Sequence, residues 1–118
     1  MSQEFLPLGT IQISPRAIAT IAYQAALRSY GVVGLAYKNF LNGVSHALVK
    51  DPQFGIDVSY DGVNIDIDIY IIVEYGTRIA QVASSVKDGV RYQVEKAIGL
   101  PVSTVNVHVR GLRISEED

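Results

Sequence analysis

The stretch from Ile56 to Val73 reads IDVSYDGVNIDIDIYIIV, and this stretch decides the fold. On both sides of Asp61-Gly62, apolar residues alternate with polar ones, as is typical of strands that have one buried and one wet face. The Asp-Gly pair tolerates the positive φ angles of a tight turn between antiparallel strands. The stretch therefore predicts a β-hairpin.

The return strand of this hairpin changes character halfway along. One face carries isoleucine and valine throughout, whereas the other face begins polar and ends with Tyr70 and Ile72. Large apolar side chains on a wet face need a cover. Either a second helix of the chain covers them, or a partner protein or a second copy of this chain does.

The remaining elements follow from periodicity and from start and stop signals. We expect a strand over 9–13, a helix that begins at Ser14-Pro15, a weaker helix over about 35–50, a long helix over 79–98 and a last strand over 105–110. The order β-α-α-β-β-α-β predicts an α+β two-layer sandwich, in which helices cover one face of a four-stranded, mainly antiparallel sheet, close to a split βαβ arrangement. A KH-like fold is the alternative.

Composition limits the possible functions. The chain has 118 residues, of which 48% are apolar, and a net charge of −2, which disfavours non-specific nucleic-acid binding. With no cysteine and two histidines, neither thiolate nor multi-histidine metal sites can form. We expect a loose leader over 1–8, one domain over 9–114 and an acidic tail over 115–118. A signal peptide and a membrane-spanning stretch are not expected.

The outward positions of the predicted sheet give the candidate site. Tyr70, Ile72, His108 and Arg110 form a candidate protein-interaction surface, because aromatic, aliphatic and arginine side chains suit such contacts. His108 and Arg110 are expected to pair with aspartates across the sheet. Asp57, Asp66 and Asp68 are interpreted as a solvated strand face rather than a cation site, and no catalytic residue, metal or cofactor is expected.

The segment Gly31-Val32-Val33-Gly34 offers an alternative function. Between two predicted helices it has the GXXG layout with which KH domains clamp a nucleic-acid backbone. Its variable pair is Val-Val rather than basic, so a glycine-bounded turn between helices is the favoured interpretation.

Several blocks in order resemble a known family. They are the GVVG segment at 31–34, YIIVEYG at 70–76, Gly99-Leu100 and VNVHVRG at 105–111. Together they resemble the alkaline shock protein family, also described as the envelope or general stress family, and its YloU-like branch in particular. The resemblance spans about Gly9 to Ile114.

The resemblance implies a cytoplasmic bacterial protein that is linked to cell-envelope homeostasis and has no enzymatic activity. It also implies self-association and recruitment to the inner face of the membrane by a small anchor protein, without direct insertion. The first hypothesis is therefore a non-catalytic interaction protein, and nucleic-acid binding through 31–34 is the second.

Overall fold

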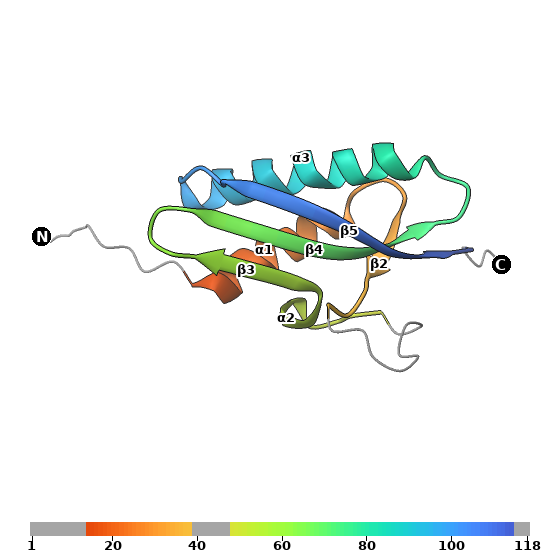
Figure 1. Ribbon diagram of the computed structural model, residues 1–118, viewed down its shortest axis with the longest axis horizontal. Helices are drawn as coiled ribbons and strands as arrows, with labels where there is room; N and C mark the ends of the chain where they lie inside the picture. Colours follow the sequence, from red (N-terminus) through yellow and green to blue (C-terminus); the bar gives the residue numbers. More distant parts are fainter. Residues whose placement is uncertain (1–13, 39–47, 115–118) are drawn as a thin grey trace, which may run out of the picture.

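The computed structural model describes residues 14–38 and 48–114 (Figure 1). The expected strand over 9–13, the leader and the tail lie outside the described residues. The elements, in chain order, are α1 (Pro15–Leu27), β2 (Val32–Leu35), α2 (Pro52–Gly55), β3 (Ile56–Tyr60), β4 (Ile65–Glu74), α3 (Ile79–Ile98) and β5 (Thr104–Arg113).

The start of α1 and both ends of α3 lie where the sequence predicts, whereas α1 already ends at Leu27 and not at Gly31. The Ser14 hydroxyl accepts hydrogen bonds from the backbone N–H groups of Arg16 (3.1 Å) and Ala17 (3.4 Å), so that α1 starts from a capped turn with proline at its first position. Helix α3 buries a single valine stripe and ends at Gly99, whose φ of 75° closes the last turn. A side-chain cap therefore sets the start of α1 and a left-handed glycine sets the end of α3, whereas Arg78 at the start of α3 makes no side-chain capping bond.

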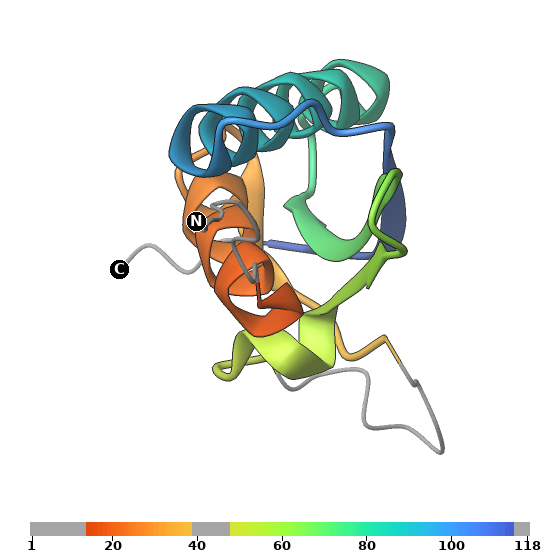
Figure 2. The same cartoon turned by 90° about the vertical axis from the view of Figure 1, so that its left-hand side faces the viewer.

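The sheet is organised around β4. Strand β5 pairs with β4 in parallel along one edge. On the other edge, β3 pairs with residues 65–69 and β2 with residues 71–73, both antiparallel. Helices α1 and α3 cover one face of the sheet (Figure 2). The predicted two-layer α+β fold with a mainly antiparallel sheet is confirmed.

The core lies between β4 and the two long helices. The five inward residues of β4 are at most 1% exposed, and the valine stripe of α3 is at most 2% exposed. Small residues of α1, among them Ala22 and Ala26, allow that helix to approach the sheet closely. The outer face of the sheet, which is turned away from α1 and α3, is not used by this core and is where a functional site is sought.

The hairpin turn between β3 and β4 is fixed by one carboxylate. Asp61 Oδ1 accepts hydrogen bonds from the backbone N–H groups of Asn64 (2.7 Å) and Val63 (2.9 Å). These bonds, the one from Asn64 first, hold the pKa of Asp61 below its usual value, because both stabilise the ionised form.

A pH dependence follows from this turn. Because the pKa is lower in the folded state, the stabilisation is present above the unfolded pKa of about 3.9 and is lost as the pH falls through the folded value. Titration of the Asp61 carboxyl by NMR should give a midpoint below the ordinary aspartate value of about 3.9. A midpoint at or above that value would contradict this account.

The segment 31–34 is not a turn between two helices. Val32–Leu35 form β2, which pairs with the second half of β4, and Leu35 is fully buried beneath it. Two adjacent β-branched valines favour an extended chain. Pairing with β4 then satisfies their backbone groups, so the interpretation as a glycine-bounded turn is wrong.

The second predicted helix also differs from the structure. Residues 36–38 and 48–50 are not helical, and 39–47 lie outside the described residues. Hydrogen bonds from Ala36 N to Tyr70 O (2.8 Å) and from Val49 N to Leu35 O (2.9 Å) tie this part of the chain to the sheet instead. A short helix, α2, begins only after Asp51, whose side chain caps it.

Candidate protein-interaction face

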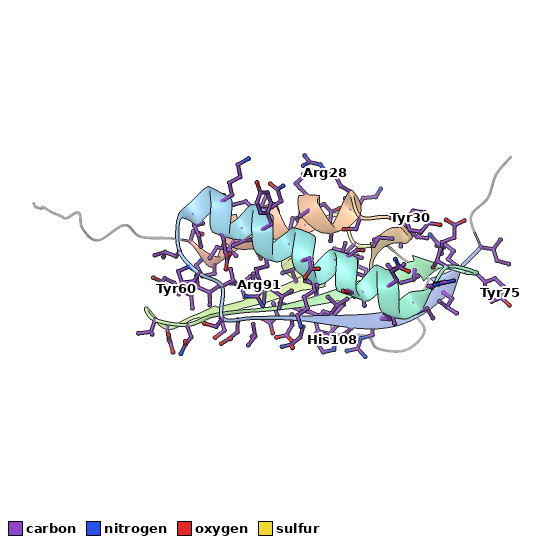
Figure 3. All side chains as sticks on the ribbon, turned by 90° about the horizontal axis from the view of Figure 1, so that it is seen from above. Arg28, Tyr30, Tyr60, Tyr75, Arg91 and His108 are labelled. Carbon is purple, nitrogen blue, oxygen red and sulfur yellow. The ribbon has the colours of Figure 1, made fainter. Side chains whose placement is uncertain are left out.

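Polar and aromatic side chains of β4 and β5 gather on the outer face of the sheet. Figure 3 shows His108 pointing away from the helices, on the side opposite Arg28 of the α1 end. In a parallel pair, residues in register point to the same face, and the register joins Asp66 to Thr104 and Tyr70 to His108. The outer ladder consists of Asp66, Asp68, Tyr70, Thr104, Asn106, His108 and Arg110.

Both aspartates of the outer ladder have partners on β5. Thr104 Oγ1 donates a hydrogen bond to Asp66 Oδ1 (2.7 Å), and His108 Nε2 lies 3.0 Å from Asp68 Oδ1. The expected pairing of His108 with an aspartate across the sheet is confirmed. These contacts turn the carboxylates toward the edge strand.

Tyr70 is the centre of a stacked group. Its ring lies 4.6 Å from the His108 ring, with only 13° between the planes, and the Arg110 guanidinium carbon lies 4.9 Å from the Tyr70 ring centroid. Arg110 therefore makes a cation–π contact with an aromatic ring instead of the expected pair with an aspartate. An aromatic ring held by two neighbours loses little side-chain entropy on binding a partner.

A β-bulge explains the position of Arg110. Val109 is in register with Ile71, and Gly111 is in register with Ile72, so Arg110 is an extra residue on β5. Such a bulge re-aims a side chain relative to the regular alternation of the strand. It leaves Arg110 exposed while its guanidinium lies over Tyr70.

Ile72 is not part of the accessible surface. It is only 5% exposed, and its partner on β2 is Gly34. A Cβ built on Gly34 would lie 3.1 Å from the methyl carbons of Leu48, so Leu48 lies over the face to which Ile72 points. The chain itself covers this end of the sheet, and the candidate surface is reduced to Tyr70, His108 and Arg110.

The segment 31–34, the alternative nucleic-acid loop, does not have the geometry of a KH-type clamp. Val32 and Val33 are half-buried in a strand instead of standing free between two helices. Gly31 and Gly34 face packed side chains, of Val82 and Leu48 respectively. A KH-type clamp needs an accessible loop backbone, which this segment does not offer.

The acidic residues of the sheet form pairs rather than a cluster. Asp57 on β3 lies 3.7 Å from the Lys38 ammonium, while Asp66 and Asp68 contact Thr104 and His108. Among residues 14–38 and 48–114, no group of three potential ligands is placed to hold a metal ion. Paired charges beside an anchored aromatic ring suit recognition of another protein surface.

Sequence reasoning missed a groove beside this face. The β5 groove runs between the edge strand β5 and helix α3, and it is lined by Ala83, Ser84, Lys87, Val105, Asn106, Val107 and His108. It arises because β5 pairs with β4 on one side only within the described residues. One sequence signal could have indicated this groove. The predicted order of a strand, a long helix and a strand is typical of a crossover unit, in which the helix connects two parallel strands, here β4 and β5.

The fold and the outer ladder define a small α+β protein with a candidate interaction face. Residues 4–114 match the model of the alkaline shock protein 23 family, described as having a cell envelope-related function, and the chain belongs to this family. The resemblance noted in the sequence is thereby confirmed.

Two relatives are similar to the chain in sequence, and one solved structure is similar to it in fold. It is 42% identical over 109 residues to the uncharacterized protein YloU of Bacillus subtilis, covering 91% of each. It is 30% identical over 98 residues to a stress response regulator gls24 homolog of Streptococcus pyogenes, covering 73% of this chain and 55% of that one. A copper form of the MamM CTD has the same fold, with a TM-score of 0.51, 20% identity and coverage of 86% of this chain and 90% of that chain.

None of the helices in the described part of the chain combines the length and the apolar character needed to cross a bilayer.

Proposed function

We propose that this protein is a non-catalytic interaction protein of cell-envelope homeostasis, which acts by self-association and by docking to a membrane-anchored partner. The observation that carries the proposal is the Tyr70 group of the outer ladder, in which the aromatic ring is held between His108 and Arg110. Tyrosine and arginine are the side chains that most often dominate protein interfaces. The family's cell envelope-related function gives the setting.

Self-association is tested with one substitution and a matched control. Light scattering behind size exclusion, over a wide concentration range, should show an oligomer for the native protein. Arg110→Glu should weaken its association about tenfold or more, because it removes the cation from Tyr70 and reverses a charge on the face. Arg28→Glu makes the same charge change on the opposite side of the molecule and should have no effect.

Docking has its own readout. A fluorescent fusion expressed in the protein's own host should lie at the cell periphery, and Arg110→Glu should disperse it while Arg28→Glu should not. A native protein that stays monomeric at every concentration contradicts the self-association, and a native fusion spread evenly through the cell contradicts the docking.

A further inference from the structure

The outer ladder has a charge order along the strands. Asp66 and Asp68 lie at the start of β4, and Arg110 lies near the end of β5. Because these strands are parallel, the ladder carries two aspartates at one end and Arg110 at the other, and beyond Arg110 the opposite charges of Glu74 and Arg113 are in register. A surface of this kind is complementary to itself after a two-fold rotation, since the rotation brings the basic end of one copy to the acidic end of the other.

The edge of β5 allows such a rotation to form a continuous sheet. Its outer backbone edge carries no ladder partner in the described ranges, and no proline, inward charge or bulge interrupts residues 104–109. These are the devices that usually block an edge from pairing with another chain. The β5 groove lies beside this edge, and Ala83 and Ser84 on its helical side are small enough to admit a second strand.

We infer that a second copy of this chain occupies the β5 groove, with the two β5 strands antiparallel about a two-fold axis at Val107. This inference rests on the proposed self-association. In this register Val105 opposes Val109 of the second copy, so the valines that face the helices form one apolar stripe across both copies. Directly opposed residues of antiparallel strands share a face, which restricts the register to those that keep valine against valine.

The same register explains the charge order. Arg110 of one copy lies opposite Thr104 of the other, and Thr104 holds the Asp66 carboxylate at 2.7 Å. Two strand spacings are about 10 Å, a distance that an arginine and an aspartate side chain can bridge together once the guanidinium turns from Tyr70 toward the second copy. Within one copy, Arg110 and Thr104 lie about 20 Å apart along the strand, so this ion pair can form only between copies.

A charge-exchange cycle tests the inference. Asp66→Lys and Arg110→Glu should each weaken dimerisation about tenfold or more, because each places like charges at two symmetric contacts. The double variant exchanges both charges and should bring the dissociation constant back to within about threefold of the native value. Asp57→Lys changes the same charge on β3, away from the β5 edge, and should not weaken the dimer.

A cross-link gives a readout that does not depend on charge. Because the chain contains no cysteine, Val107→Cys introduces a single thiol. Because residue 107 lies on the two-fold axis, Val107→Cys should form a disulfide with the same residue of the second copy under mild oxidation. Thr104→Cys should not, because residue 104 of one copy lies about 20 Å from residue 104 of the other.

The outcomes separate the inference from the proposed function. If the native protein is monomeric, both fail. If it associates but the double variant stays as weak as the single ones, or if Thr104→Cys cross-links in place of Val107→Cys, the β5 arrangement is wrong while self-association stands.

Discussion

Ile72→Asp is expected to lower the free energy of unfolding by about 4 kcal/mol or more. The side chain is 5% exposed, so the substitution removes a packed aliphatic group and places a carboxylate where water cannot reach it. Urea unfolding measures the effect. The loss should be smaller near pH 3 than at pH 7, because burial disfavours only the ionised form of the new carboxyl group.

The same substitution at a second isoleucine separates burial from chemistry. Ile114 is 73% exposed, and Ile114→Asp should change the free energy of unfolding by no more than about 0.5 kcal/mol. Equal, small effects at both positions would contradict the burial of Ile72. The pair also shows why Ile72→Asp is a poor test of an interface, since a loss of association would follow from unfolding.

The sequence predicted those elements whose signals are local. The β-hairpin at Asp61-Gly62, the alternation on both sides of it and the valine stripe of α3 each depend on neighbours along the chain, and each is confirmed. The predicted two-residue turn is wrong in length, because residues 61–64 connect Tyr60 to its partner Ile65. Strand β2 depends on a distant partner, because its pairing with residues 71–73 decides its conformation. Four residues are also too few for periodicity to separate a strand from a helix.

The outer ladder was predicted correctly where the strands alternate regularly, and incorrectly where a bulge or a distant residue intervenes. Regular alternation correctly placed Tyr70 and His108 on one face, where they stack. The bulge at Arg110 breaks alternation, and only the following Gly111 signalled it. The burial of Ile72 depends on the absence of a side chain at Gly34 and on Leu48 from a later segment, which no local pattern reveals.

Gly31→Ala is expected to destabilise the fold by about 3 kcal/mol. Gly31 has a φ of 86°, and a Cβ built on it would lie 2.6 Å from Cγ2 of Val82. The left-handed conformation contributes about 1 kcal/mol of this cost, and the overlap with a buried, β-branched side chain that cannot easily rotate contributes the rest. Denaturant unfolding should show the loss in the transition midpoint.

Gly76→Ala isolates the steric part of this effect. Gly76 has a φ of 95° but no atom within 4 Å of an added Cβ, so its replacement should cost only about 1 kcal/mol. Both replacements restrict the unfolded chain equally, so that contribution cancels in the comparison. Equal losses at the two glycines would mean that Val82 does not touch this position.

A double variant tests the contact between Gly31 and Val82 directly. Val82→Ala alone should be destabilising, because Val82 is 2% exposed. Combined with Gly31→Ala it should cost about 2 kcal/mol less than the sum of the single losses, since the methyl groups that oppose the new Cβ are gone. Additive losses would place the strain elsewhere. Coupling would show that Val82 of α3 limits the space beside the glycine that connects α1 to β2.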